Sequence, residues 1–301
     1  RGVEMSIAIV SDSASDLPKD ILKKFNITEV PVNVTFGDKV YKENVDLTGD
    51  EVYKKLTDGS DFPTTSQPSP GDFEKIYTSL LKKYDEILSI HISSKVSGTY
   101  NSAIQAADKV GKGKITVVDS LSVSMGTGLV IIKVAEMLKE KKSSKIKDLE
   151  KYAKELVGKS RIIVACETVE YLKRGGRVSS AAAFFGGLLN VKPVIGNRDG
   201  EVISISRPRS MVKALSFLRR EAESYKNHQG MAVMQTTESF DSRALYNSLS
   251  GNQEVKGKKD ESASTKNMYV GNVVKAQFGP AIGAHAGPGA VGVAFIGDAP
   301  D

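Results

Sequence analysis

Short apolar runs alternate with helix-like patterns through the first half of the chain. At the start of the chain, the segment SIAIVSD indicates a buried strand and LPKDILKKF indicates a helix that follows it. Pro18 suits the first turn of this helix. Thr48 and Glu51 have the spacing of a helix capping box. A serine precedes Pro70 where an apolar period typical of a helix begins. These positions predict further helix starts.

The same alternation continues to about residue 142. The expected strands are ITEVPVNVTF, DEILSIHIS and KITVVDS, and the expected helices between and after them are SGTYNSAIQAADKV and GTGLVIIKVAEMLKEKK. Strands that alternate with helices of this length form a mostly parallel sheet with helices on both faces. The sequence therefore predicts an α/β domain over residues 1–158.

The pattern changes after a charged helix at residues 143–157. RIIVACE reads as a strand, and TVEYLKRGGRVSSAAAFFGGLLN as two short helices broken at Gly175 and Gly176. Asp199 and Gly200 supply the turn signal of a hairpin. A long helix at residues 210–226, the strand GMAVMQT, the helix SFDSRALYNSL and the strand AVGVAFIG complete the chain. We predict an α+β domain with a mixed sheet over residues 159–301.

The composition is ordinary for a globular protein, with 40% hydrophobic and 26% charged residues among 301. No stretch approaches the roughly 18 consecutive apolar residues of a membrane span. The net charge of +6 comes from lysines that alternate with glutamates along helical faces, as on a solvated surface. Because no nucleic-acid-binding signature accompanies this charge, we expect no nucleic-acid partner.

The single cysteine, Cys166, excludes an intramolecular disulfide and a multi-cysteine zinc site. It stands in an apolar run, which favours a buried structural thiol over a nucleophile. The first residues, RGVEMSIAIVSD, lack the pattern of a signal peptide. We therefore expect a cytoplasmic protein without a metal site.

Clusters of hydroxyl residues stand where expected strands end and helices begin: SDSASD, TTSQPSP, SSKVSGTY and DSLSVSMGTG. Ligands bind at this edge of open α/β sheets, and helix N-termini there favour an anion. Each cluster alone also fits a plain N-cap, so both interpretations remain open. Phosphate-binding and dinucleotide-binding motifs are absent, so we expect no cofactor. The hydroxyl groups of these clusters are neutral hydrogen-bond donors, which suit a single carboxylate as the anion.

The segment GPAIGAHAGPGAVGV contains one of only three histidines, His285. Glycine at this density weakens helices and strands. A hairpin turn would explain the segment, and so would a pocket in which the backbone approaches a ligand closely. The residues alone leave both explanations open.

In order along the chain, the segments SDSASDL, TTSQPSP, SSKVSGTYNSA, LKRGGRVS, NVKPVI and GAHAGPGAVGV resemble the DegV family of bacterial fatty-acid-binding proteins. The resemblance covers nearly the whole chain and is specific as an ordered set. It implies two α/β domains with a long-chain fatty acid buried between them. In the members termed FakB, the fatty acid is presented to a separate fatty acid kinase, which makes an acyl phosphate for phospholipid synthesis.

The resemblance also implies roles for individual residues. The residues that it implies as ligands of the fatty acid carboxylate are Thr65 of TSQPS, Ser97 with its neighbour Gly98 in SGTY, and His285. It places His285 on a glycine-rich turn that a ligand approaches closely. Arg174 and Arg177 of LKRGGR are expected near the presented head group.

The run AAAFFGGLLN is a candidate wall of the acyl tunnel, with Phe184, Phe185 and Leu188 supplying apolar surface. An ordinary packed core helix explains these three residues equally well. A long polar insert at residues 251–267 departs from the family pattern. Lipid exchange would also bring the protein into peripheral contact with a membrane.

We expect a non-catalytic lipid carrier that serves as an accessory subunit of a fatty acid kinase. The alternative is a hydrolase of a lipid ester that uses Ser97 or Ser13 with His285. That alternative lacks a nucleophile elbow and an obvious acidic residue to orient the histidine.

Overall fold

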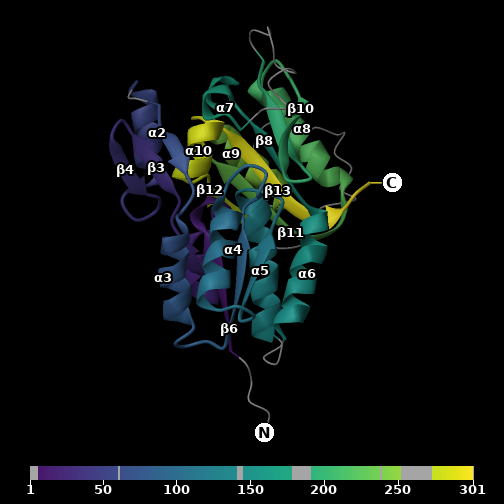
Figure 1. Cartoon of the computed structure of the whole chain (residues 1–301). Helices are drawn as coiled ribbons and strands as arrows, with labels where there is room; N and C mark the ends of the chain where they lie inside the picture. The colour runs from purple at the N-terminus through teal and green to yellow at the C-terminus, as the bar shows by residue number, and fades with distance from the viewer. Residues whose placement is uncertain are drawn as a thin grey trace.

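The computed structural model describes residues 6–59, 62–140, 145–177, 191–237, 239–251 and 273–300. Within them the chain forms a four-stranded, a six-stranded and a three-stranded sheet (Figure 1). The candidate tunnel residues Phe184, Phe185 and Leu188 lie outside the described residues, as does the polar insert apart from Gly251.

The first sheet is parallel throughout, and its strands in order are β2 (Thr28–Val30), β1 (Ile7–Asp12), β6 (Glu86–His91) and β7 (Ile115–Asp119). Every residue of β1 is buried because helices cover both faces. Ala8 and Val10 pack under α3 (Pro70–Leu80) and α4 (Thr99–Val110). Ile7 and Ile9 pack on the opposite face, which is covered by α1 (Lys19–Phe25), α5 (Met125–Glu140) and α6 (Ile146–Lys159).

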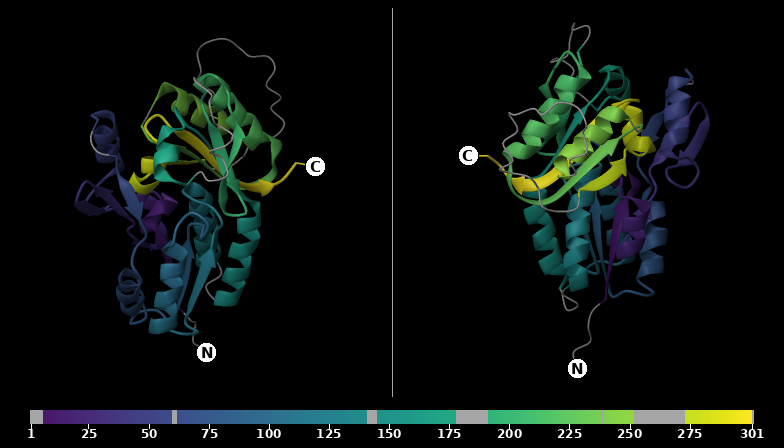
Figure 2. Two further views of the ribbon diagram at one scale, coloured as in Figure 1. Left: turned by 45° about the horizontal axis from the view of Figure 1, so that its top comes forward. Right: turned by 180° about the vertical axis from the view of Figure 1, so that it is seen from behind.

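The second sheet is mixed, and its strands in order are β10 (Glu201–Ser206), β9 (Val194–Arg198), β8 (Ser160–Ala165), β13 (Val291–Asp298), β11 (Lys226–Gln235) and β12 (Val274–Gln277). Neighbouring strands are antiparallel except for the parallel pair β11 and β12. The helices α8 (Met211–Ser224) and α9 (Phe240–Leu249) cover one face (Figure 2). The opposite face packs on α5, so this helix contributes to a core shared by both large sheets.

The third sheet is antiparallel, in the order β4 (Lys39–Lys42), β3 (Asn33–Phe36) and β5 (Thr64–Ser66), and α2 (Gly49–Thr57) follows β4 in the chain. The sequence predicted one strand over residues 27–36. The structure divides it into β2 and β3, which belong to different sheets. The break falls at Pro31, which lacks the N–H that a continuous ladder needs.

Several local predictions are confirmed. Thr48 and Ser69 each accept a hydrogen bond from the third helical residue, and both form capping boxes. Asp199 and Gly200 form the turn between β9 and β10, both with positive φ. The predicted fold class, a parallel α/β part followed by a part with a mixed sheet, is also confirmed. The boundary near residue 158 falls in the last turn of α6 and stays a prediction.

No helix in the described part of the chain is long and apolar enough to cross a membrane. The same residues contain no group of three or more His, Cys, Asp or Glu side chains arranged to hold a metal ion. Cys166 is buried, and burial raises the pKa of its thiol to about 12. The thiol is therefore protonated at neutral pH, as the structural interpretation predicted.

Candidate functional site

An apolar cavity lies where the carboxyl end of the parallel sheet meets the six-stranded sheet. Residues that follow β6 and β7 line it from one side, including Ile92, Val96 and Val123, and β8 lines it from the other with Ile162 and Val164. Its volume is about 110 Å³, measured as the space open to the centre of a water molecule. One water needs roughly 10–15 Å³ on this measure, so the cavity is much larger than a single-water site.

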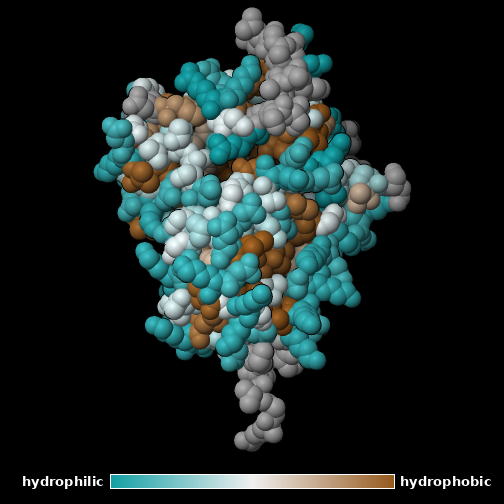
Figure 3. All heavy atoms as spheres, in the orientation of Figure 1, coloured by the Kyte–Doolittle hydropathy of each residue, from teal (hydrophilic) through white to brown (hydrophobic). Residues whose placement is uncertain are grey.

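The polar residues that line the cavity gather at one end. They are Thr65, Ser66, Gln67, Ser97, Arg177 and His285. Ser66, Gln67 and Arg177 are exposed, whereas the apolar lining residues Ile92, Ile162 and Phe278 are buried. The cavity therefore has a polar mouth open to solvent and an apolar interior. Figure 3 shows hydrophobic surface lying between hydrophilic residues on one face of the molecule.

His285 and Thr65 are in direct contact at this mouth. Thr65 lies on β5, and its Oγ1 is 2.8 Å from Nε2 of His285. The sequence placed His285 on a glycine-rich turn, and this prediction is wrong. The residue lies on a short helix, α10 (Pro280–Ala286), in which Pro280 occupies the first turn and alanines support the helix.

A close approach of the backbone makes room for the imidazole. Gly175, the last residue of α7 (Glu170–Gly175), faces the ring, and a Cβ placed there would lie 1.9 Å from Nδ1 of His285. Burial, with the positive charge of Arg177 as a second cause, lowers the pKa of His285 to about 4. The imidazole is therefore neutral at pH 7.

The hydrogen-bond partners indicate which ring nitrogen carries the hydrogen. Nδ1 of His285 is buried and has no hydrogen-bond partner among the described residues. An orphaned N–H is rarer than an orphaned acceptor. We therefore assign the hydrogen to Nε2, which donates to Thr65 Oγ1. The hydroxyl hydrogen of Thr65 is then available to donate to a ligand oxygen.

Ser97 lines the same mouth from the loop that precedes α4. Its Oγ lies 2.8 Å from Oγ1 of Thr99 and accepts from the backbone N–H of Thr99 at 3.3 Å. Gly98 is the N-cap of α4, and a Cβ there would lie 2.7 Å from Nε2 of Gln67. Gly98 thus lets the end of β5 and the start of α4 meet, which brings Ser97 to the cavity that Thr65 lines.

The two predicted arginines have different surroundings. Arg177 lines the cavity and donates to the carbonyl oxygen of Gly175 at 2.8 Å. Arg174 does not line it. Its side chain is exposed, pairs with Glu170 at 2.6 Å and lies over the ring of Phe62. The structure brings Arg177 to the mouth together with Thr65, Ser97 and His285, and leaves Arg174 on the outer surface.

A buried polar network on β1 and β6 was not expected from the sequence. Nε2 of His91 lies 2.7 Å from Ser89 Oγ, and Nδ1 lies 2.9 Å from Asp12 Oδ2. This is the order of contacts in a Ser-His-Asp triad. All three residues are fully buried and none lines the cavity, and Ser89 also contacts the hydroxyl of Tyr77 at 2.8 Å. These side chains form a polar network inside the core, in which Asp12 Oδ1 has no hydrogen-bond partner among the described residues. The alternating Ser-x-His of a strand was its signal in the sequence.

Comparisons with known proteins agree with this architecture. Residues 6–298 match the family described as "Uncharacterised protein, DegV family". A DegV domain-containing protein of Caldanaerobacter subterraneus is 36% identical over 292 residues, which are 96% of this chain and 98% of that protein.

Solved structures of similar proteins extend the comparison. A fatty-acid-binding DegV family protein from Thermus thermophilus has a TM-score of 0.85 and 32% identity, covering 97% of this chain and 100% of that one. DegV from Bacillus subtilis, described as a fatty acid binding protein, has a TM-score of 0.82 and 30% identity, covering 98% and 100%.

The two large sheets and the apolar cavity between them define a two-part α/β protein. With the match over nearly its whole length, the chain belongs to the DegV family.

Proposed function

We propose that this chain binds a long-chain fatty acid, with the carboxylate at the polar mouth and the acyl tail in the apolar interior. The observation that carries the proposal is the direct pairing of Thr65 with a neutral His285 at the mouth of a buried apolar cavity. The related proteins of Thermus thermophilus and Bacillus subtilis are described as fatty-acid-binding, which supports it.

The chemistry of the mouth suits one carboxylate. The hydroxyls of Thr65 and Ser97 can each donate to a ligand oxygen. A tail of about 15 methylenes contributes roughly 0.8 kcal/mol for each one buried, before the costs of ordering and association. The tail therefore provides the driving force, and the polar mouth fixes its direction.

Presentation of the carboxylate to a fatty acid kinase is the second part of the proposal. It is supported by the exposure of Ser66, Gln67 and Arg177 around the mouth, where a partner enzyme could reach the head group. Arg177→Ala is expected to spare fatty acid binding and to impair acyl phosphate formation by the kinase of the same organism. Arg174→Ala is the comparison, because Arg174 lies outside the cavity. Loss of lipid binding in Arg177→Ala would assign this arginine to the carboxylate site itself.

A carrier fits the site better than a hydrolase. Within the part of the chain that the structure describes, no carboxylate accepts a hydrogen bond from His285, so the orienting acid of a triad is not supplied. Ser13, the other candidate nucleophile, is fully buried and donates to Glu43. A cytoplasmic location, peripheral membrane contact during lipid exchange and the absence of a cofactor stay predictions.

Native mass spectrometry of the purified protein tests the proposal. The expected result is one bound fatty acid per chain, and delipidated protein should unfold at a higher temperature when oleate or palmitate is added. Turnover of a lipid ester without retained fatty acid would favour the hydrolase. A melting temperature that neither fatty acid changes would contradict the carrier.

A further inference from the structure

Two buried carboxylates hold the N-terminal end of α10 against the N-terminal half of the chain. Oε1 of Glu43 accepts the backbone N–H of Ala281 at 2.8 Å, and Oδ1 of Asp16 accepts that of Gly279 at 2.9 Å. These N–H groups belong to the first turn of the helix and its cap, where no helical carbonyl can accept from them. The start of the helix that carries His285 is therefore satisfied by residues more than 200 positions away in the sequence.

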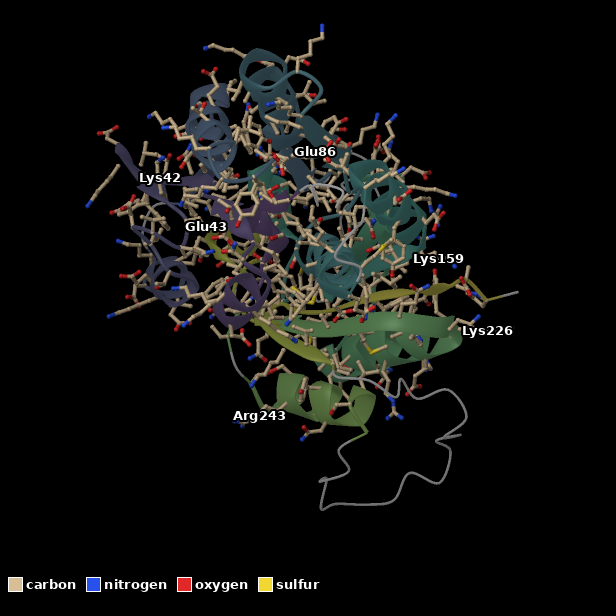
Figure 4. The ribbon with its side chains drawn as sticks, turned by 90° about the horizontal axis from the view of Figure 1, so that it is seen from below. Lys42, Glu43, Glu86, Lys159, Lys226 and Arg243 are labelled. Carbon is tan, nitrogen blue, oxygen red and sulfur yellow. The ribbon has the colours of Figure 1, made fainter. Side chains whose placement is uncertain are left out.

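The second oxygen of each carboxylate accepts a hydrogen bond from a serine hydroxyl. Ser13 donates to Oε2 of Glu43, and Ser124 donates to Oδ2 of Asp16 at 2.5 Å. Glu43 is fully buried and Asp16 is 6% exposed. All four carboxylate oxygens thus accept a hydrogen bond, so both side chains have fixed orientations. In Figure 4, Glu43 lies further toward the middle of the molecule than its neighbour Lys42.

The packing around α10 leaves little freedom for the helix. A Cβ on Gly279 would lie 2.5 Å from Oε1 of Glu43 and 2.8 Å from Oδ1 of Asp16. Tyr53 of α2 donates its hydroxyl to the carbonyl oxygen of Phe278, just before the helix. A Cβ on Gly283 would lie 2.1 Å from this same hydroxyl. A helix of seven residues is not stable by itself, so these contacts determine where it lies.

We propose that Asp16 and Glu43 are positioning residues for His285. By fixing the first turn of α10, they place the imidazole, about one turn later, against Thr65 at the mouth of the cavity. Their effect on ligand affinity rests on the proposed function, because it assumes that the ligand carboxylate binds at this mouth. Their effect on the imidazole does not depend on any ligand.

Among the described residues, the charged groups that act on the two carboxylates are themselves acidic. Burial, and for Asp16 also the charge of Glu43, raises the pKa of Asp16 well above its usual range. Burial raises the pKa of Glu43 to about 7, with Glu29 and Asp12 adding to the effect. The groups that face the pair are thus acidic or neutral, and Tyr53 is the phenol among them. The backbone and hydroxyl donors therefore provide the stabilising contacts.

The test measures His285 directly by NMR titration of the imidazole in ligand-free protein. We expect Glu43→Leu, which removes the acceptor and keeps the volume, to move the pKa of His285 from about 4 toward 6.5 as the helix loosens. Glu43→Gln keeps an acceptor for Ala281 and should leave the titration of His285 near its wild-type position. Oleate binding should weaken about tenfold in Glu43→Leu and less than about threefold in Glu43→Gln.

The matched control is Glu29→Leu. Glu29 is a half-buried carboxylate whose pKa is also raised by burial, and it accepts from Asn44 rather than from α10. An equal change of the His285 titration in Glu29→Leu would show general loosening of the fold and overturn the proposal. An unchanged His285 titration in a folded Glu43→Leu protein would overturn it as well.

Asp16→Ala supplies an independent variant, because it removes only the acceptor of Gly279. If Glu43→Leu does not fold, the titration of His285 in Asp16→Ala decides the outcome by the same criterion. A wild-type protein that binds no fatty acid, combined with a shifted His285 titration in these variants, would contradict the proposed function and leave the positioning role standing.

Discussion

The contact between Thr65 and His285 joins residues 220 positions apart and defines the polar end of the cavity. We predict that Thr65→Ala and Ser97→Ala each weaken fatty acid binding about ten- to a hundredfold, because hydrogen bonds to a charged group are worth roughly 1.5–3 kcal/mol. His285→Ala should weaken binding as well, because it removes the Nε2 donor that leaves the Thr65 hydroxyl hydrogen available to the ligand. Competition with a fluorescent fatty acid measures the effect. Combined substitutions should be less than additive, since the residues serve one ligand.

Thr64→Ala is the control for these variants. Thr64 is the exposed neighbour of Thr65 on β5 and does not line the cavity. The affinity of Thr64→Ala for the fatty acid should equal that of the wild type. Wild-type affinity in all three site variants would place the carboxylate elsewhere.

A second prediction at this scale concerns the pH dependence of stability through His285. Burial lowers its pKa from 6.5 to about 4, so between these values the unfolded chain binds a proton that the folded chain does not. The stabilising contribution is therefore complete above pH 6.5 and is lost as pH falls through 4. Between pH 7 and pH 4.5, the free energy of unfolding should fall more for wild type than for His285→Gln, as measured by denaturant unfolding. Equal losses would mean that the imidazole is not buried as described.

At the scale of elements, the end of α7 packs closely against α10 because Gly175 has no side chain. Gly175→Ala would place a Cβ 1.9 Å from Nδ1 of His285, so the imidazole must shift from the position in which it contacts Thr65. We expect fatty acid binding to weaken by about tenfold or more, as for loss of one hydrogen bond to a charged group. The affinity measured by the same competition assay checks this.

Gly158→Ala is the matched substitution. Gly158 also lies in a helix, α6, and a Cβ there meets nothing within 4 Å. Alanine should leave binding unchanged and stabilise the helix by up to about 1 kcal/mol. Unchanged binding in Gly175→Ala would show that the imidazole has room to spare.

At the scale of the whole molecule, Glu43 couples pH to the contact between the two halves. Its pKa rises from 4.5 to about 7 on folding, so in this range the folded chain binds the proton that the unfolded chain has released. The free energy of unfolding should therefore fall as pH rises from 4.5 through 7, by about 1.4 kcal/mol for each unit of pKa difference. Glu43→Gln should remove this contribution.

Denaturant unfolding of wild type and Glu43→Gln at pH 5 and pH 8 measures that difference. The stability of the variant relative to wild type should be higher at pH 8 than at pH 5. Equal relative stability at the two pH values would mean that Glu43 is ionised without cost in the folded protein. This slope opposes that of His285, so single-residue variants are needed to separate the two.

The sequence by itself determined most of the elements and the parallel character of the first sheet. Capping boxes at Thr48 and Ser69 and the turn at Asp199 and Gly200 are local, since each depends on residues a few positions apart. Alternation of apolar runs with helical periods likewise predicted the parallel sheet. Thr65, Ser97 and His285 were recognisable as one site only through the ordered set of motifs.

Tertiary structure decided which side chains meet. Glu43 follows an exposed strand, yet it is fully buried because α10 returns from the far end of the chain to cover it. Arg174 and Arg177 stand in one motif, but the chain turns at Gly176 with a φ of 67°, and only Arg177 reaches the cavity. Such placements depend on contacts between distant segments, which local patterns do not encode.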